Sequence, residues 1–583
     1  MDLPWLDSPV LLHSSRADKC TLTAAQCAFR RGHWRYWYQA DHVFGHATIY
    51  FICAVVGIFT ISNILSRLSR SPKGNGLRSN GLWQRSVALS RYNAYRSFHL
   101  RGLNWFSPSV GVMLLGVCGA VYFFALTLGP KPYYWPNTKH PSVSYGGSPP
   151  LATRTGWMSL ALLPFVMILS SKANYITLFT GISHEKLQVF HRWDMMMQWK
   201  MSVVYWTGVA ALIPQAWLNI MSIGPIRNRY YEFFKSFHYI AIILFIFFLF
   251  IHCDFRLTSW DYFIASLTLY LSTLCYSFGR MFLRKINHVP FLRHTHHASL
   301  LNLPDGTIQL SVPTTMTWSA GQHVFLRFWG LGVHSFSTHP FTISSLPSSG
   351  SMIFYIKPHT GGLTERLHNL ASQSNGNKVA VSIDGPYGHS SVAQTLSTYD
   401  KVLLVAGGSG STFILPILEA LAFTPGQRTI KMVVATKSTS SSTWFVDAVS
   451  QILSQSSPQH GANTKVQVYI TSPASTPTDT GSSNSDLEKA LTATATSKPD
   501  TGSDISSNVE AKSTEQISVI TNQGRPDLKK IIADQSGDVI LGIAACGPEE
   551  MMLDARNACA DAQVAVLAGR KKEVWLHCES FGW

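Results

Sequence analysis

Two histidines near the middle of the chain have a spacing suited to metal cofactors. His238 and His252 lie fourteen residues apart within one apolar stretch, 236–253. In a helix this spacing is about four turns and roughly 21 Å of rise, so both side chains would lie nearly on one face. Neutral imidazoles are common axial ligands of haem iron, and two at this separation could hold two stacked haems across a membrane. The alternative is a pair of interfacial histidines at opposite ends of a span.

A glycine-rich turn at residues 407–410 could bind a nucleotide. The apolar run 402–406 precedes Gly407, Gly408 and Gly410, and a helical stretch follows. A glycine turn between a strand and a helix brings backbone N–H groups and a helix N-terminus to a phosphate. Many α/β proteins have such a turn without a nucleotide, so this turn alone does not identify a site. Residues 431–437 predict the next strand, and residues 538–558 a further strand, turn and helix.

Apolar segments must position the two histidines. Six of them are long enough, or nearly long enough, to cross a bilayer. They lie near residues 43–65, 108–129, 155–171, 201–222, 236–253 and 261–282. The apolar residues are concentrated before about residue 285, and the remainder has an ordinary soluble α/β composition. The chain is therefore predicted to have a membrane half and a globular half.

The charge pattern predicts the orientation of the membrane half. The formal net charge is +16 and only 13% of residues are charged, against roughly 25% in soluble chains. Nucleic acid is one partner such a balance allows, but the basic residues cluster beside apolar spans. Residues 66–102 hold eight Lys or Arg and no acid, which is typical of a cytoplasmic loop. We therefore expect a bilayer partner and no nucleic acid, with the N-terminus outside.

The loop charges also predict a conflict in the number of crossings. Loops 172–200 and 223–235 are both basic and should both lie inside. The segment 201–222 would then begin and end inside, which one span cannot do. One crossing is missing between about residues 191 and 201.

The globular half begins near residue 286. Segments 308–312, 323–328 and 353–356 are short apolar strands that predict a small β-barrel. Residues of about 471–515 are rich in Ser and Thr with scattered Pro and Asp. Such a segment forms a core poorly, and we expect a disordered insertion there.

Several short motifs resemble those of the ferric reductase and NADPH oxidase superfamily, and within it the fungal ferric reductases. In the globular half these are His339-Pro340-Phe341-Thr342, Gly321–Val324, Lys357 with residues 361–364, the 407–410 turn, Cys546-Gly547-Pro548 and the ending Glu579–Trp583. In the membrane half they are Phe190–Trp193 and residues 231–252. The order and spacing of these motifs are more specific than any one of them.

The resemblance implies a multi-domain membrane protein. An extracellular segment (1–42) would precede an α-helical haem-binding transmembrane bundle (43–285). An FAD-binding β-barrel (286–395) and an NADP-binding α/β domain (396–583) would follow, arranged as in ferredoxin reductases. The location implied is multi-pass in a membrane, with the plasma membrane expected.

The resemblance also implies roles for residues at the flavin. Within the motif that includes Pro340 and Phe341, Thr342 would hydrogen-bond near the flavin ring and His339 would shape its pocket. Lys357, with the backbone around Gly362 and Thr364, would neutralise the FAD diphosphate.

At the nicotinamide nucleotide, the turn with Gly407, Gly408 and Gly410 would bind the pyrophosphate of NADPH. Cys546, Gly547 and Pro548 would lie beside the nicotinamide. Trp583 would cover the isoalloxazine face and give way to nicotinamide. Lys437 stands where the family usually has an arginine near the 2′-phosphate, and lysine serves there as a point charge but not as a bidentate fork.

The haem ligands are where the chain departs from the resemblance. His191 and His238 would hold the inner haem b, and His252 would ligate the outer one. The residue expected opposite His252 is Tyr205, and His191 and His238 are only 47 residues apart (238 minus 191). Two explanations stay open: coding sequence lost between Trp193 and Met201, or a diverged protein with altered electron transfer.

The activity implied is reduction of ferric or cupric chelates at the cell surface, serving metal uptake. A hydride from NADPH would reach FAD, and single electrons would then pass through the haems to the outside. Three alternatives stay open: superoxide production by an NADPH oxidase-like enzyme, an oxidoreductase of a biosynthetic pathway, and a degenerate homologue that moves no electrons. The sequence leaves the oligomeric state open.

Overall fold

The computed structural model describes most of the membrane bundle and of the two globular domains. The described residues are 10–11, 23–25, 35–36, 41–70, 75–103, 105–131, 150–171, 175–182, 206–223, 226–227, 231–253, 259–283, 296–360, 362–373, 376–388, 390–426, 428–455, 462–472, 517–535, 540–570 and 572–579.

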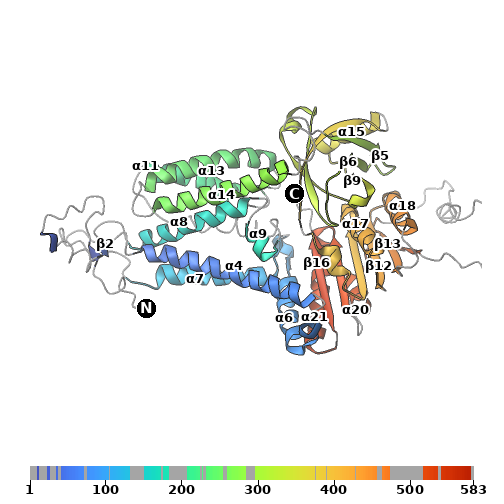
Figure 1. Ribbon diagram of the computed structural model, residues 1–583, viewed down its shortest axis with the longest axis horizontal. Coiled ribbons are helices and arrows are strands. Elements are labelled where there is room, and N and C mark those ends of the chain that lie inside the picture. Colours follow the sequence, from blue (N-terminus) through green and yellow to red (C-terminus); the bar gives the residue numbers. More distant parts are fainter. Residues whose placement is uncertain are drawn as a thin grey trace, which may run out of the picture.

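The chain divides into a helical bundle and two domains built on sheets, which lie together at one end of the bundle (Figure 1). Each of the six predicted apolar segments overlaps one helix. These helices are α4 (His42–Arg70), α7 (Val110–Leu128), α8 (Pro150–Ser170), α11 (Trp206–Met221), α13 (Tyr231–Cys253) and α14 (Ser259–Leu283). By length and composition α4, α7 and residues 153–170 of α8 can each cross a membrane. The crossing missing between about residues 191 and 201 lies outside the described residues.

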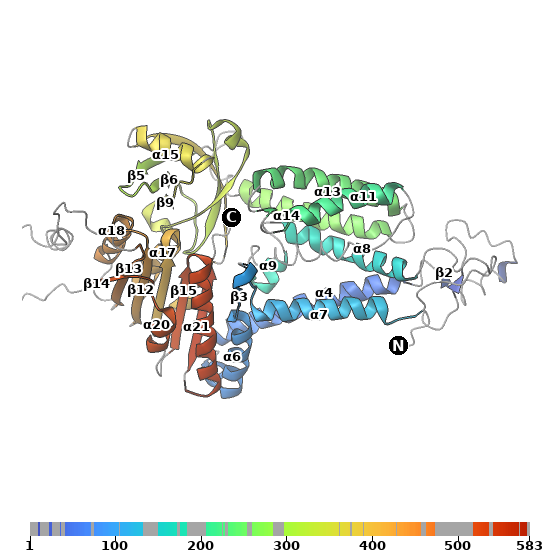
Figure 2. The ribbon, with the colours of Figure 1, turned by 180° about the vertical axis from the view of Figure 1, so that it is seen from behind.

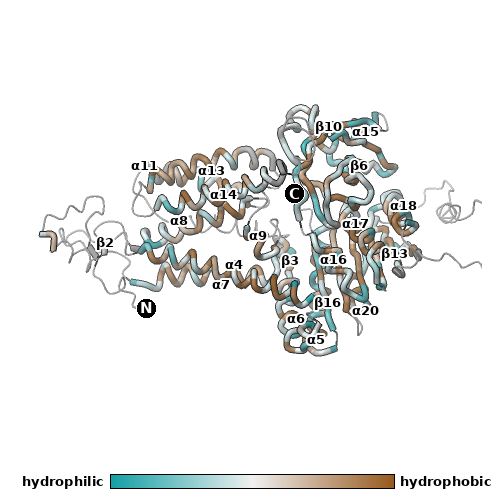
Figure 3. The backbone as a smooth tube through the Cα atoms, viewed as in Figure 1, coloured by the Kyte–Doolittle hydropathy of each residue, from teal (hydrophilic) through white to brown (hydrophobic). Residues whose placement is uncertain are grey.

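The bundle holds together through side chains shared by four helices. Trp157 and Leu160 of α8, Leu218 of α11, Phe245 of α13 and Tyr262 of α14 lie in one buried cluster. Many other apolar residues of these helices face outward, and the bundle is hydrophobic along its length (Figure 3). Outward apolar faces suit contact with lipid, because the hydrocarbon core cannot solvate polar groups.

Contacts between α8 and α14 fix the directions of the last helices. Tyr262, near the start of α14, lies 6.2 Å from Trp157 near the start of α8. The hydroxyl oxygens of Ser171 and Thr273 lie 2.5 Å apart further along. Both helices therefore end on the side of the globular domains. Only residues 254–258 separate α13 from α14, so α13 runs the opposite way, with His238 near the globular domains and His252 at the far end.

The first globular domain is an antiparallel sheet, as expected for the barrel. Its strand order is β8-β7-β10-β5-β6-β9. The strands are β5 (His296–Asn302), β6 (Ile308–Pro313), β7 (His323–Phe328), β8 (His339–Thr342), β9 (Ser351–Ile356) and β10 (Lys378–Tyr387), with helix α15 (Leu363–Gln373) beside them. Alternate residues of β6, β7 and β9 are buried, which is the period-2 pattern of half-buried strands.

The second globular domain is a parallel sheet covered on both faces, as expected for the α/β domain. Its strand order is β14-β13-β12-β11-β15-β16, and every pair is parallel. The strands are β11 (Lys401–Gly407), β12 (Arg428–Thr436), β13 (Ala462–Ile470), β14 (Ile517–Gln523), β15 (Ile540–Cys546) and β16 (Glu573–Glu579). The helices are α17 (Ser411–Ala422), α18 (Ser440–Gln455), α20 (Leu528–Gln535) and α21 (Glu549–Leu567). The insertion predicted at about 471–515 lies almost wholly outside the described residues.

The basic loop between α4 and α7 is folded. It contains α5 (Asn75–Ser79), α6 (Gly81–Tyr95), and the short strands β3 (His99–Leu100) and β4 (Trp105–Phe106). The side chain of Asn80 caps α6 by accepting hydrogen bonds from the backbone N–H groups of Leu82 and Trp83, as asparagine commonly does at this position. Helix α6 lies along α21 of the parallel-sheet domain (Figure 2).

Candidate flavin and nicotinamide sites

The parallel sheet has a change of direction between β11 and β15. Strands β12, β13 and β14 extend to one side of β11, whereas β15 and β16 extend to the other. At such a switch point the loops that leave neighbouring strands diverge and open a crevice at their carboxyl ends. Gly407 and Cys546 end these two strands, and Ala406 pairs with Cys546 in the ladder. The structure therefore brings two of the predicted motifs together.

Three glycines let the two loops approach closely. A Cβ atom at Gly410 would overlap the carbonyl oxygen of Cys546, and one at Gly407 would lie 2.6 Å from Cδ of Pro548. A Cβ atom at Gly547 would lie 3.0 Å from the backbone nitrogen of Gly407. The short helix Gly408–Gly410 leads directly into α17, whose N-terminus carries the positive end of the helix dipole. This arrangement fits the pyrophosphate of a dinucleotide.

Two further predicted residues lie at the same edge of the sheet. Lys437 directly follows β12 and is exposed. Cys546 is fully buried, and this burial raises the pKa of its thiol well above the ordinary value. The thiol is therefore protonated near neutral pH and does not act as a thiolate. Trp583 lies outside the described residues.

The predicted flavin motif forms strand β8, at the edge of the antiparallel sheet. Phe341 packs edge-to-face on Phe328 and Phe354, with ring centroids 6.1 and 6.4 Å apart. Because neighbouring residues of a strand point to opposite faces, Pro340 and Thr342 lie on the face away from these rings. The Nε2 atom of His339 is 2.9 Å from the hydroxyl of Ser337. The packing of Phe341 thus leaves the Thr342 hydroxyl on the face where a flavin could bind.

The predicted diphosphate residues surround the start of α15. Lys357 directly follows β9 and is exposed. Gly362 has a φ of +92°, a conformation that glycine adopts without strain. The hydroxyl oxygen of Thr364, in the first turn of α15, accepts a hydrogen bond of 3.0 Å from the backbone N–H of His359. A cation and a helix N-terminus at one place fit a diphosphate.

The antiparallel sheet docks on α17 and α18, so the two sites adjoin. The backbone N–H of Leu346 donates to Oε2 of Glu419 at 3.1 Å. Tyr355 stacks on Trp444, with ring centroids 4.4 Å apart. Gly321 approaches Phe413 so closely that a Cβ atom would lie 3.1 Å from its ring. These contacts hold the predicted flavin strand beside the crevice at β11 and β15.

The two described haem-ligand candidates lie on one unbroken helix. His238 and His252 are both in α13, as the sequence predicts. The ring of His238 lies 5.0 Å from that of Phe234, one turn earlier. His191 and Tyr205 lie outside the described residues. Among the residues that the structure describes, no group of three or more His, Cys, Asp or Glu could hold a metal ion, and haem needs at most one or two such ligands per iron.

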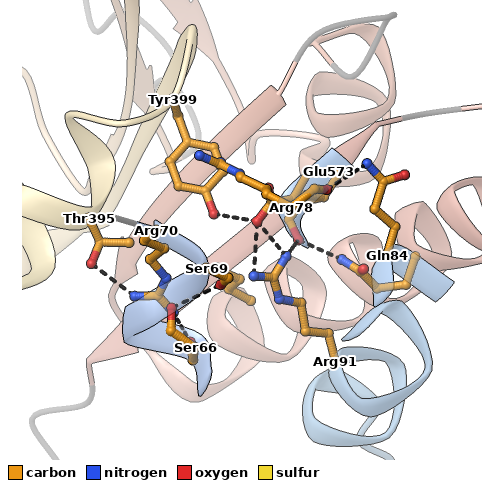
Figure 4. A network of polar contacts seen from close by, with 12 residues as sticks. Ser66, Ser69, Arg70, Arg78, Gln84, Arg91, Thr395, Tyr399 and Glu573 are labelled. Atoms are coloured by element: carbon orange, nitrogen blue, oxygen red, sulfur yellow. Dashed lines mark hydrogen bonds and ion pairs between the residues drawn. The ribbon is translucent and has the colours of Figure 1, made fainter. Parts of the chain in front are cut away.

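Glu573 is an ionic centre that the sequence analysis missed. Its carboxylate accepts hydrogen bonds from Arg78, Arg91 and the Tyr399 hydroxyl at 2.8, 3.0 and 2.7 Å (Figure 4). Burial alone would raise the pKa of Glu573, but Arg91 and Arg78 outweigh it and lower that pKa to about 2. Glu573 is part of no motif and lies hundreds of residues from both arginines, so no local signal could have identified it.

Three protein-family profiles match the chain in the order of the structure. The profile "Ferric reductase like transmembrane component" matches residues 155–194. The profile "FAD-binding domain" matches residues 293–391. The profile "Ferric reductase NAD binding domain" matches residues 399–560. The second covers the antiparallel sheet, and the third covers the parallel sheet except β16. The first covers α8 from residue 155 onward and the predicted motif at Phe190–Trp193.

Curated fungal proteins are similar over most of the chain. The "Ferric/cupric reductase transmembrane component 7" of Saccharomyces cerevisiae is 27% identical over 603 residues, which cover 93% of each chain. The "Ferric reductase transmembrane component 3" of the same yeast is 24% identical over 90% of this chain and 76% of that protein. The "Probable cell surface ferric reductase kap2" of Aspergillus oryzae is 29% identical over 58% of this chain, a match that spans about half (49%) of that relative.

The profiles, the relatives and the fold agree on one family. The membrane helices come first, the FAD-binding sheet second and the NAD(P)-binding sheet third. The chain therefore belongs to the ferric reductase family, as a multi-pass membrane oxidoreductase with FAD-binding and NAD(P)-binding domains.

Proposed function

We propose that this protein takes electrons from cytosolic NADPH and passes them through FAD and haem b to ferric or cupric chelates across the plasma membrane. The reduced metal would then serve uptake. One arrangement carries the proposal. The carboxyl ends of β11 and β15, the strand β8 and the end of α13 that bears His238 all lie where the bundle meets the globular domains (Figures 1 and 2).

The NADPH-binding residues have separate tasks in this proposal. Gly407, Gly408 and Gly410 would receive the pyrophosphate at the N-terminus of α17, where a Cβ atom at Gly408 would meet nothing within 4 Å. Lys437 would attract the 2′-phosphate as a point charge. Cys546, with Gly547 and Pro548, would border the nicotinamide. Together these residues would orient the nicotinamide toward β8.

The flavin-binding residues would hold the ring against the same crevice. Thr342 would hydrogen-bond at the ring edge, while Phe341 anchors the strand in the core and His339 shapes the pocket. Lys357 and the first turn of α15, with Gly362 and Thr364, would bind the diphosphate. Trp583 would cover the ring and exclude water until nicotinamide enters. When bound, FAD accepts a hydride and releases single electrons, which haem b can relay.

On α13, the two histidines would face the haems at two depths of the membrane. Fourteen residues of helix separate His238 from His252 by roughly 21 Å. His191 would complete the inner site. The outer site depends on whether Tyr205, or residues absent from this sequence, stand opposite His252. The haem stoichiometry is therefore the most informative single measurement.

The test uses the full-length chain purified from membranes. Haem per flavin is measured first, and NADPH is then added without oxygen while the flavin and haem bands are recorded. Two reducible haems per flavin support the complete relay. One haem or none beside a reducible flavin means that this chain, as written, does not pass electrons outward by this route.

A second arm separates the acceptors. In cells that express the chain, reduction of an impermeable ferric chelate should be insensitive to superoxide dismutase. A dismutase-sensitive signal would favour an NADPH oxidase-like activity. The variant His238→Ala should lose NADPH-driven haem reduction while its flavin is still reduced. Equal loss of both reductions would contradict the proposed role of His238.

A further inference from the structure

The loop between α4 and α7 covers one edge of the NAD(P)-binding sheet. Helix α6 lies along α21, and Ala88 of α6 is buried in the same apolar cluster as Ala555 and Cys559 of α21. Figures 1 and 2 show the two helices side by side. A segment that connects two membrane spans thus contributes to the core of a globular domain.

The contact continues onto β16, the last strand of that sheet. The phenol oxygen of Tyr95 accepts a hydrogen bond of 3.0 Å from the backbone N–H of Leu576. Arg91 donates to the carbonyl oxygen of Val574 at 3.0 Å. Edge strands otherwise expose unpaired backbone groups, so α6 satisfies polar groups that the sheet itself leaves open.

The carboxylate of Glu573 lies at the centre of this contact. Arg78 of α5 and Arg91 of α6 both bind it, and their side chains are 21% and 15% exposed, against 18% for Glu573. Tyr399, two residues before β11, binds the same carboxylate from within the domain. We call this group, Glu573 with Arg78, Arg91 and Tyr399, the Glu573 clamp. Figure 4 shows it beside Arg70, the last residue of α4, which donates to the Thr395 hydroxyl at 3.2 Å.

Two other ion pairs of this domain are exposed to solvent. Arg525 and Glu550 are 81% and 61% exposed, and Lys529 and Asp561 are 79% and 45% exposed. Exposed pairs contribute little to stability, because water screens them and their side chains lose entropy. The Glu573 clamp is largely shielded, and it joins the membrane loop to the domain.

We propose that Glu573 is a positioning residue, which holds the NAD(P)-binding domain under the bundle so that electrons from the flavin reach α13. This inference rests on the proposed function. The clamp should affect only one of two electron-transfer steps. Reduction of the flavin by NADPH takes place within the globular domains and does not need the clamp. Transfer from the flavin to the haem crosses the boundary that the clamp fixes.

The test compares Glu573→Gln with the unchanged full-length chain in lipid nanodiscs, loaded with FAD and haem. Anaerobic stopped-flow mixing with NADPH follows the flavin and haem bands. We expect the rate of flavin reduction to stay within twofold of that in the unchanged chain, and the rate of haem reduction to fall at least tenfold. A destabilised nucleotide-binding domain would instead slow both steps.

A second readout does not depend on electron transfer. Hydrogen exchange of peptides covering 81–95 and 573–579 reports whether α6 stays on β16. In Glu573→Gln these peptides should exchange at least tenfold faster, while residues 401–407 of β11 stay protected. Lys529→Gln is the matched control, because it removes only the exposed contact of Asp561 within the domain and leaves the Arg96–Asp561 pair in place. It should change neither rate nor exchange.

The double variant Arg78→Gln/Arg91→Gln removes the two loop residues of the clamp and leaves the sequence of the NAD(P)-binding domain unchanged. It should reproduce the selective loss of haem reduction. The inference is overturned if flavin and haem reduction fall together in both variants, or if haem reduction is unchanged although exchange at 573–579 increases. Absence of haem reduction in the unchanged chain would refute the proposed function instead, and the exchange measurement would still decide whether the clamp holds the domain.

Discussion

Gly410 lies directly against the carbonyl oxygen of Cys546, so no side chain fits between the two loops that end β11 and β15. This approach holds the carboxyl ends of β11 and β15 together at the switch point of the parallel sheet. It also places the N-terminus of α17 where a pyrophosphate would bind. The contact is backbone against backbone, and a larger residue cannot be accommodated by a change of rotamer.

Gly410→Ala should therefore impair nucleotide binding. Overpacking of this kind costs about 1–3 kcal/mol, and every 1.4 kcal/mol is about tenfold in binding. We expect KM for NADPH to rise roughly tenfold or more in a dye-reduction assay. Gly119→Ala is the control, because Gly119 lies in α7 with open space around it. An unchanged KM in Gly410→Ala would contradict the proposed phosphate site.

Lys437 should discriminate between the two nicotinamide nucleotides. Lys437→Ala removes the point charge proposed for the 2′-phosphate, so KM for NADPH should rise roughly tenfold, about 1.4 kcal/mol, while KM for NADH stays the same. Lys437→Arg offers a bidentate fork to the phosphate and should keep or improve the preference for NADPH. Equal changes for NADPH and NADH in Lys437→Ala would argue against this assignment.

The buried thiol of Cys546 should be unreactive in the folded protein. Because burial raises its pKa well above the ordinary value, almost no thiolate forms between pH 7 and 9, and alkylation requires the thiolate. Mass spectrometry after treatment with N-ethylmaleimide at pH 8 should find Cys546 unmodified in the folded chain and modified after denaturation. Rapid labelling of the native chain would show that the crevice is open to solvent at this residue.

The Glu573 clamp should be insensitive to pH throughout the cytosolic range. The folded pKa of Glu573 is about 2, below the ordinary value of 4.5, so its stabilisation is complete above pH 4.5. That stabilisation is lost as the pH falls from 4.5 toward 2. The difference in melting temperature between the unchanged chain and Glu573→Gln should be constant from pH 5 to 8. A difference that shrinks between pH 7 and 5 would contradict the lowered pKa.

A second buried ion pair should stabilise the far end of the bundle. Arg154 of α8 is 2% exposed and donates to the carbonyl oxygens of Thr127 and Pro130 at 2.8 and 2.9 Å. Its Nε atom lies 3.5 Å from the carboxylate of Asp41, just before α4. Arg154→Ala removes one partner of a buried pair, a change that costs about 3–5 kcal/mol.

Thermal unfolding in detergent tests this pair. Arg154→Ala should unfold at a clearly lower temperature than the unchanged chain. The unfolding temperature of the double variant Asp41→Asn/Arg154→Gln should fall less, because this variant leaves no unpaired buried charge. If Arg154→Ala and the double variant unfold at the same temperature, the ion pair adds little beyond the hydrogen bonds of Arg154.

The local signals in the sequence predicted the elements well. The apolar segments overlap the six bundle helices, and 308–312, 323–328, 353–356 and 402–406 lie in β6, β7, β9 and β11. These predictions depend on periodicity and on glycine turns, which a few neighbouring residues determine. Strands β13, β14 and β16 were not predicted, and the sequence contains no local sign of how they pair.

The sequence by itself determined the order of the domains, because the motifs of the nucleotide-binding domains follow the apolar spans. The charge of the loop 66–102 predicts that this loop lies inside. Only the tertiary structure decided that Arg78 and Arg91 share one carboxylate with Tyr399. The net charge of a loop can be counted from its sequence. A buried ion pair instead depends on which side chains the fold brings within about 3 Å, and here these side chains are more than 480 residues apart in the chain.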